Sequence, residues 1–236
     1  MHIFKSIYLK INDLFYKLII IMNTTSYIFP NNNILEAGID ESNRGGLIGN
    51  VVTACVVLKK AETEEEFNIY NQIKDSKKLT KKKRKELAVY IKENAITYGI
   101  AEATVEEIDN INILNATLKA MYRATDIAYK KVKFDKILID GPYYKPYIPS
   151  GEDSEVLPYE CINKGDSLYT CIAAASILAK EQHTENMINL VENNKELEKY
   201  DLLNNQGYGT KKHLNAINEY GISKWHRKTY KCCQNI

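Results

Sequence analysis

Short runs of apolar residues, many of them branched, predict the β-strands of this chain. Such runs are typical of strands when Gly, Pro or polar clusters bound them. The run at residues 136–140 (KILID) predicts a short buried strand, which Gly141 and Pro142 end. The expected strands are residues 34–40, 51–58, 98–104, 136–140 and 159–163.

Apolar residues that recur every three or four positions predict the helices. Within residues 112–131, the side chains of Ile113, Leu118 and Met121 fall at this spacing. The other expected helices are residues 80–94 (with Thr80 as the N-cap), 167–191 and 211–220. The order of the elements predicts an α/β fold, in which helices cover both faces of a mixed central β-sheet and a helical C-terminal extension follows.

The first residues carry a weak amphipathic stripe at helical spacing. The apolar run at residues 18–22 is too short to span a membrane, and no small-residue cleavage site follows it. We expect residues 1–33 to be a poorly ordered or dispensable extension, with Met22 as an alternative start; a targeting or membrane-surface role is the less favoured alternative. Residues 34–236 are expected to form one domain, whose C-terminal helical segment begins at about residue 195.

Composition indicates an ordinary soluble globular protein, with 44% hydrophobic and 26% charged residues. The net charge is only +2, yet residues 74–85 hold eight Lys or Arg. Such a run by itself is more often a solvated helix face, although local clusters can also form a phosphate-facing surface. The five cysteines lack the spacing of a zinc site, which fits reduced thiols in an intracellular protein.

Four acidic residues stand where a buried strand ends or a helix is about to begin: Asp40, Glu41, Asp140 and Asp166. A carboxylate at the end of a buried strand loses solvation unless a cation meets it. If these segments converge at one sheet edge, their oxygens suit Mg²⁺ or Mn²⁺. Two such ions can clamp the attacking and leaving oxygens of a phosphodiester.

Each acid also has an ordinary structural explanation. Asp40 and Asp140 suit turns, and Asp166 suits a helix cap. Spacing alone does not bring the segments together. Because neighbouring strand residues face opposite sides, Asp40 and Glu41 share a site only if the strand bends there.

Seven motifs resemble, in order, those of type 2 ribonucleases H, the ribonuclease HII family. They are residues 38–49 (GIDESNRGGLIG), 74–80 (KDSKKLT), 107–118 (EIDNINILNATL), 137–141 (ILIDG), 164–166 with 172–180 (IAAASILAK), 206–213 (QGYGTKKH) and 226–230 (HRKTY). The resemblance covers about residues 34–230, and each motif is typical of the family rather than generic. It implies a ribonuclease H-like fold.

The resemblance also implies an activity. Family members cut the RNA strand of RNA–DNA hybrids, and cut 5′ of single ribonucleotides embedded in duplex DNA, leaving 3′-hydroxyl and 5′-phosphate ends. This chemistry serves primer removal and ribonucleotide excision repair. By resemblance, Asp40, Glu41, Asp140 and Asp166 hold two Mg²⁺ or Mn²⁺ ions. We expect a cytoplasmic monomer with no membrane partner, leaving open the nucleus or another compartment that contains DNA.

Substrate choice depends on the 2′-hydroxyl, the only group that distinguishes RNA from DNA at one nucleotide. The family's Gly-Arg-Gly loop, which reads this hydroxyl, falls on Asn43, Arg44 and Gly45; Asn tolerates the left-handed backbone that Gly favours. The family's junction-sensing tyrosine falls on Tyr208, whose ring is expected to stack beneath the next deoxyribose. The expected phosphate contacts are Ser76, Lys77, Lys180, His183 and Arg227.

Several of these assignments have open alternatives or depart from the family pattern. Ser76 equally suits a helix cap, and Lys78 and Lys211 suit either surface solvation or phosphate contact. Gly46 stands where the family often has Pro or another small residue, which is expected to loosen the loop. After Lys180 the family commonly runs to Arg-Asp; here His183 replaces the Arg, and Thr184 cannot replace the carboxylate.

Three rival interpretations remain. The first is another nuclease on the same fold, such as a DNase or a resolvase, which the 2′-hydroxyl loop and Tyr208 disfavour. The second is a type 3 ribonuclease H, which usually carries an N-terminal domain larger than residues 1–33. The third is a hybrid-binding module without activity, which the retention of all four acids disfavours.

Overall fold

The computed structural model describes residues 34–236 except residues 75, 151–154 and 235–236. The expected extension over residues 1–33, with its alternative start at Met22, lies outside the described residues. The described chain contains a five-stranded sheet with the order β3-β2-β1-β4-β5. Its strands are β1 (Glu36–Ser42), β2 (Val51–Leu58), β3 (Ala95–Ala103), β4 (Lys136–Asp140) and β5 (Tyr159–Ile162).

The sheet is mixed, as the sequence predicts. Strand β1 pairs antiparallel with β2, and β2 pairs antiparallel with β3. On its other side β1 pairs parallel with β4, and β4 pairs parallel with β5. In this register Ile39 lies opposite Ile139, so the residues that follow them, Asp40 and Asp140, lie at the same edge of the sheet.

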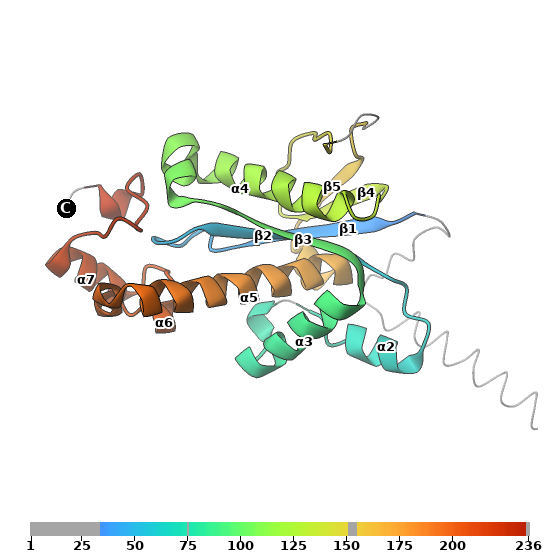
Figure 1. The fold of residues 1–236 in the computed structure, drawn as a ribbon, viewed down its shortest axis with the longest axis horizontal. Helices are drawn as coiled ribbons and strands as arrows, with labels where there is room; N and C mark the ends of the chain where they lie inside the picture. The colour runs from blue at the N-terminus through green and yellow to red at the C-terminus, as the bar shows by residue number, and fades with distance from the viewer. Residues whose placement is uncertain (1–33, 75, 151–154, 235–236) are drawn as a thin grey trace, which may run out of the picture.

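Helices cover both faces of this sheet (Figure 1). One face is covered by α4 (Val105–Tyr129), and the other by α5 (Thr170–Asn193), with α3 (Lys81–Asn94) beside it. Two glycines allow the helices to approach closely. A Cβ atom on Gly38 would overlap the backbone of Cys171 in α5, and one on Gly99 would overlap the carbonyl oxygen of Ala124 in α4.

The remaining helical elements are short. They are α2 (Glu64–Tyr70), η1 (Ser76–Lys78), η2 (Gly165–Ser167), η3 (Lys195–Tyr200), α6 (Leu202–Asn205), α7 (Lys211–Tyr220) and η4 (Lys231–Cys233). The C-terminal elements share a core of their own with Leu47, Ile48 and Val191. Within the described part of the chain, no helix combines the length and the apolar character that a bilayer span requires.

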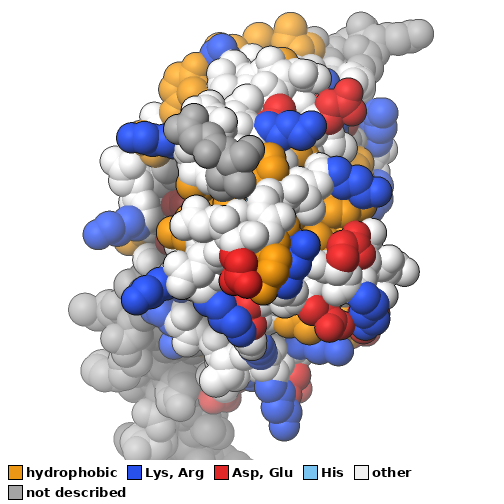
Figure 2. Space-filling model, turned by 90° about the vertical axis from the view of Figure 1, so that its left-hand side faces the viewer, with side chains coloured by type: hydrophobic (Ala, Val, Ile, Leu, Met, Phe, Trp, Pro, Cys, Tyr) orange, Lys and Arg blue, Asp and Glu red, His pale blue; other side chains and the backbone are white. Residues whose placement is uncertain are grey.

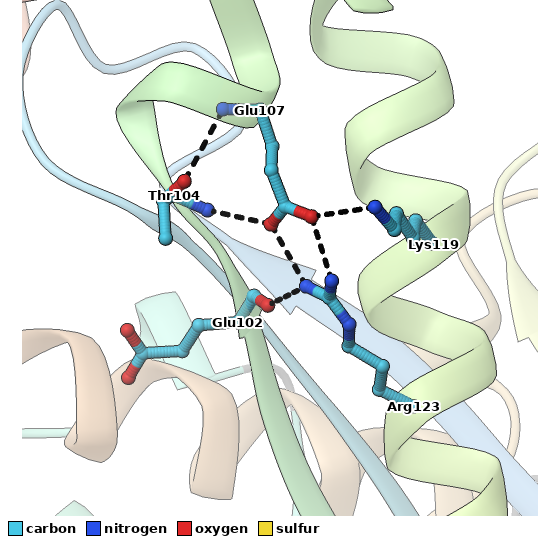
Figure 3. Close-up of polar contacts among 5 residues, drawn as sticks. All are labelled: Glu102, Thr104, Glu107, Lys119 and Arg123. Atoms are coloured by element: carbon cyan, nitrogen blue, oxygen red, sulfur yellow. Dashed lines mark hydrogen bonds and ion pairs between the residues drawn. The ribbon is translucent and has the colours of Figure 1, made fainter.

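A polar network holds the junction between β3 and α4 (Figure 3). Thr104 caps α4, and Glu107 completes a reciprocal capping box with it. The Glu107 carboxylate also accepts hydrogen bonds from Arg123 at 2.6 and 2.8 Å and from Lys119 at 2.7 Å. The pKa of Glu107 is lowered to about 2, and the hydrogen bonds from Arg123 are the largest cause. The glutamate of the EIDNINILNATL motif therefore has a structural role here.

The aspartate of the same motif joins α4 to the C-terminal segment. Asp109 accepts hydrogen bonds from the backbone N–H groups of Lys228 and Thr229, and from the Thr229 hydroxyl at 2.8 Å. Nearby, the helix bends at Asn112, whose φ of 65° is non-helical. Helix α4 thus begins before the kink, earlier than residue 112, where periodicity alone places its start.

Candidate active site

Three carboxylates meet at the edge where the parallel strands end. One oxygen from each of Asp40, Asp140 and Asp166 lies within 4.8 Å of the others. Asp40 belongs to β1, Asp140 ends β4, and Asp166 lies in η2, which follows β5. Asp40 and Asp166 are buried, with exposures of 6% and 8%. Parallel pairing of β1 with β4 and of β4 with β5 brings the three segments together.

Short hydrogen bonds hold the first two carboxylates in place. The Gly165 N–H donates to Oδ1 of Asp140 at 2.6 Å, and the Glu41 N–H donates to Oδ1 of Asp40 at 2.7 Å. A Cβ atom on Gly165 would lie 2.6 Å from Cδ1 of Ile172 in α5 and 3.4 Å from Oδ1 of Asp140 in β4, so η2 fits closely against both elements. The close fit of η2 against β4 therefore places Asp166 beside Asp140.

A chain of two hydroxyls reaches Asp40. The Ser176 hydroxyl of α5 hydrogen-bonds to the Asp40 carboxylate. The hydroxyl of Ser76 lies 2.9 Å from that of Ser176, and both side chains are buried. Sequence analysis did not identify Ser176. Its signal is a single polar residue within the small apolar run of residues 171–179.

The site is electrostatically unfavourable without a cation. Burial, followed by the charges of Glu41 and Asp140, raises the pKa of Asp40 well above its ordinary value. Burial also raises the pKa of Glu41. Buried carboxylates that repel one another, and that offer only oxygen donors, fit a hard divalent cation such as Mg²⁺ or Mn²⁺.

Glu41 stands beside the three aspartates rather than among them. Its carboxylate lies 3.5 Å from the guanidinium of Arg44, and its side chain is 15% exposed. The charge of Asp140 contributes to its raised pKa, so the two groups interact. Of the four acids that sequence analysis singles out, the described structure thus joins three in one cluster and places the fourth next to it.

The loop after β1 is held from inside the protein. Asn43 adopts a left-handed backbone with φ of 68°, and its side-chain amide donates to the carbonyl oxygens of Ile48 and Asn50 at 3.0 and 2.9 Å. Arg44 and Gly45 are exposed. A Cβ atom on Gly45 would lie 3.9 Å from the ring of Tyr208, which is 38% exposed. The loop and this tyrosine are therefore neighbours.

Arg227 supports this loop from inside the protein, a role that differs from the phosphate contact expected from the sequence. The side chain is completely buried. Its guanidinium donates to the carbonyl oxygens of Asn43 at 2.7 Å, Arg44 at 3.0 Å and Gly49 at 2.9 Å, and to the Tyr230 hydroxyl. With its donors used in this way, Arg227 positions the loop; its contact with a phosphate stays a prediction.

Ser76 and His183 also differ from their expected phosphate contacts, because both are buried. Ser76 is 3% exposed and faces Ser176 rather than solvent. His183 is completely buried, and its Nε2 lies 2.9 Å from the Gln206 carbonyl oxygen. Burial lowers the pKa of His183 to about 4, so the ring is neutral near pH 7. It cannot replace a cationic arginine.

Two of the expected phosphate contacts remain accessible. Lys77 is exposed, and it is close enough to Glu41 for its charge to offset part of the rise in the pKa of Glu41. The Lys180 ammonium lies 5.4 Å from the centroid of the Tyr208 ring. Burial, followed by the charge of Arg84, lowers the pKa of Lys180 to about 8.

The basic helix α3 contributes a contact that sequence analysis missed. Arg84 is buried and forms an ion pair with Glu181 of α5, so one of the charges in the basic run is internal. Figure 2 shows the end of the molecule that carries the C-terminal segment, where Lys and Arg side chains are interspersed with Asp and Glu. Basic side chains on this face do not form one continuous patch.

Comparisons with known proteins identify the family. The family model described as Ribonuclease HII matches residues 37–233. Ribonuclease HII of Christiangramia forsetii is 43% identical over 203 residues, which cover 86% of this chain and 93% of that protein.

Solved structures share the fold at lower identity. Ribonuclease H2 from Pyrococcus horikoshii has a TM-score of 0.64 at 22% identity, with coverage of 85% of this chain and 95% of that chain. Bst ribonuclease HIII in complex with Mn²⁺ has a TM-score of 0.57 at 20% identity, with coverage of 80% of this chain and 63% of that chain. Likeness at such identities shows a common architecture.

Proposed function

Because the chain belongs to the ribonuclease HII family, whose members are type 2 ribonucleases H, we propose that it cuts the RNA strand of RNA–DNA hybrids and cuts 5′ of single ribonucleotides embedded in duplex DNA. The observation that carries this proposal is the buried cluster of Asp40, Asp140 and Asp166 at the sheet edge. These two substrates correspond to primer removal and ribonucleotide excision repair.

The cofactor is a pair of Mg²⁺ or Mn²⁺ ions, held by Asp40, Glu41, Asp140 and Asp166. Support comes from the all-oxygen donor set and from the repulsion that raises the pKa values of Asp40 and Glu41. When bound, such ions supply an activated water and stabilise charge on the leaving oxygen. The products carry 3′-hydroxyl and 5′-phosphate ends.

The protein's own contribution is positioning. Hydrogen bonds from Gly165 and Ser176 orient Asp140 and Asp40 before any substrate binds. The exposed backbone at Arg44 and Gly45 reads the 2′-hydroxyl, and the Arg44 side chain, 47% exposed, binds the adjacent phosphate. Asn43 and Arg227 hold this backbone from behind.

The remaining substrate contacts flank this loop. The half-exposed ring of Tyr208, next to Gly45, stacks beneath the deoxyribose that follows the ribonucleotide. Lys77 lies near Glu41 and Lys180 lies near the Tyr208 ring, and both bind phosphates of the cut strand. Lys78 and Lys211 are exposed and are assigned to more distant phosphates.

The experiment is a cleavage assay on three labelled duplexes, in Mg²⁺, in Mn²⁺ and in a chelator. One duplex is a continuous RNA–DNA hybrid, one is DNA with a single ribonucleotide, and one is DNA only. We expect metal-dependent cutting of the first two, with the single-ribonucleotide duplex cut on its 5′ side, and no cutting of the third. End-group analysis of the products checks the 3′-hydroxyl and 5′-phosphate.

The other outcomes separate the rival interpretations. Cutting of the continuous hybrid alone indicates a different class of ribonuclease H. Cutting of the DNA-only duplex indicates a DNase or a resolvase. Binding without cutting under all conditions indicates a hybrid-binding module. The Asp140→Asn variant is the matched control, because any cutting it retains reveals contamination by another nuclease.

A further inference from the structure

Two histidines form a buried pair in the C-terminal segment, behind Tyr208. His213 lies on α7, His226 lies in the following turn, and both side chains are completely buried. Their Nε2 atoms are 3.1 Å apart. The ring of Tyr200 packs against both, with its centroid 5.8 Å from that of His213 and 4.7 Å from that of His226.

The hydrogen bonds around the pair determine which nitrogens carry protons. The Ser223 N–H donates to Nδ1 of His226 at 3.0 Å, so this nitrogen is an acceptor. A neutral imidazole carries its one proton on the other nitrogen. His226 therefore donates from Nε2 to Nε2 of His213.

His213 carries its proton on the nitrogen that faces Tyr208. Its Nε2 is an acceptor, so its proton lies on Nδ1, which donates to the Tyr208 carbonyl oxygen at 3.0 Å. Burial lowers the pKa of His226 to about 4 and lowers the pKa of His213, so both rings are neutral near pH 7. This assignment satisfies every contact in a chain that runs from Ser223 to Tyr208.

The chain ends on the backbone of the tyrosine that faces the substrate. The Tyr208 carbonyl oxygen also accepts from the Thr210 N–H at 2.8 Å, and the Tyr208 N–H donates to the Asn205 carbonyl oxygen at 3.0 Å. The backbone is thus fixed on its buried side, while the ring stands half-exposed beside Gly45.

We propose that His213 and His226 are positioning residues that fix the Tyr208 ring, and that they set the preference for a ribonucleotide followed by a deoxyribonucleotide over a continuous RNA strand. This inference rests on the proposed function. A stacking ring discriminates by close fit, and small displacements of a positioning group have large effects on rate. Loss of the His213 contact therefore affects the single-ribonucleotide substrate more than the continuous hybrid.

Two substitutions of His213 separate its two hydrogen bonds. In His213→Asn, the side-chain amide nitrogen takes the place of Nδ1 and keeps the donor to Tyr208. In His213→Gln, the amide takes the place of Nε2, which keeps the contact with His226 and loses the donor to Tyr208. The measurement is the ratio of kcat/KM on the single-ribonucleotide duplex to kcat/KM on the continuous hybrid, for the full chain in Mg²⁺.

We expect His213→Gln to lower this ratio by about 3- to 10-fold, the effect of one lost hydrogen bond, and His213→Asn to keep it within about 2-fold of the parent. The same His213→Gln change on a Tyr208→Ala background should leave the ratio unaltered, because the ring is gone. Thermal unfolding checks that the two His213 variants are folded; a merely structural role would lower both kcat/KM values together.

The inference is overturned if His213→Gln changes both substrates equally, if His213→Asn lowers the ratio as much as His213→Gln, or if the ratio still falls on the Tyr208→Ala background. Should a variant fail to fold, His226→Asn replaces it: its amide takes the place of Nδ1, keeps the contact with Ser223 and loses the donor to Nε2 of His213, so the ratio should fall in the same direction. Failure of the proposed function has a different signature: the parent chain itself leaves the single-ribonucleotide duplex uncut.

Discussion

The side-chain oxygen of Asn43 occupies the space that a Cβ atom on residue 46 would need. The Asn43 side chain cannot move aside freely, because its amide nitrogen donates to the carbonyl oxygens of Ile48 and Asn50. A glycine at position 46 is therefore required by the asparagine at position 43. The two departures from the family's loop pattern are therefore coupled; that Gly46 loosens the loop stays a prediction.

This relationship predicts a coupled pair of substitutions. Gly46→Ala should destabilise the parent by about 1–3 kcal/mol, the usual cost of overpacking a filled site. In the double variant Asn43→Gly with Gly46→Ala, the second change should add little to the loss caused by the first, because the obstructing side chain is gone. Thermal unfolding of the two single variants and the double variant gives the coupling energy. Additive effects would contradict the relationship.

The Ser76–Ser176–Asp40 chain predicts an effect on metal affinity. Ser176→Ala should weaken Mn²⁺ binding on the order of 10-fold, as loss of a group that orients a metal ligand commonly does. Ser76→Ala should have a smaller effect in the same direction, since it acts through Ser176. Calorimetric titration with Mn²⁺ measures this, with Ser150→Ala, whose side chain contacts Asp126, as a remote control. Equal affinities in all variants would refute the chain.

The Asp140→Asn variant should lose activity without losing its fold. Its amide oxygen can still accept from the Gly165 N–H, so η2 stays in place. The missing charge should lower turnover by about 10³-fold, since metal-assisted charge stabilisation supplies several kcal/mol. Binding of hybrid, measured by fluorescence anisotropy, should remain within a few-fold of the parent. Turnover near the parental rate would remove Asp140 from the catalytic set.

The Asp140→Asn variant should also change how the stability of the protein depends on pH. Burial and the charges of Glu41 and Asp140 place the folded-state pKa of Asp40 above its ordinary value of 3.8. Ionisation of Asp40 therefore opposes folding: this cost is absent below the unfolded-state pKa, and it grows as the pH rises towards the folded-state pKa. Asp140→Asn removes one of the charges that raise this pKa, so it reduces the cost of ionising Asp40.

In a chelator we expect Asp140→Asn to unfold at a higher temperature than the parent near pH 8, and at about the same temperature near pH 4. Each kcal/mol corresponds to roughly 2–4 °C for a chain of this size. Saturating Mn²⁺ should reverse the order, because the parent binds the ions better. Calorimetry in the two conditions tests this, and a parent that is the more stable protein in chelator at pH 8 would disprove the electrostatic account.

Arg227→Lys should lower the free energy of unfolding by more than the exchange of one cation for another suggests. Lysine cannot reach the carbonyl oxygens of Asn43, Arg44 and Gly49 together, so buried acceptors lose their donors. We expect a loss of about 2–4 kcal/mol, or roughly 4–16 °C in unfolding temperature, with reduced cleavage of both substrates. The exposed neighbour Lys228, changed to Arg, is the control for the exchange of one cation for another; an equal effect of the two changes would contradict the supporting role of Arg227.

Much of the fold is predictable from local sequence. The apolar runs that predict strands correspond to β1 to β5, and helical spacing locates α3, α4, α5 and α7, with ends that differ by a few residues. The largest difference is the start of α4, where Asn112 departs from helical geometry. Local patterns suffice here because the periodicity of buried side chains follows directly from strand and helix geometry.

The roles of individual polar residues were decided by tertiary structure. Motifs indicated that Ser76, His183 and Arg227 matter, but solvent-facing and buried roles look alike in a sequence. Ser76 meets Ser176 across 100 positions, and Arg227 meets Asn43 across 184. Whether a polar group contacts substrate or supports the residue that does depends on which distant segments pack around it. The sequence alone determined the acids, the strands that carry them and the family; packing of distant segments decided which polar side chains face solvent, because burial belongs to the assembled fold.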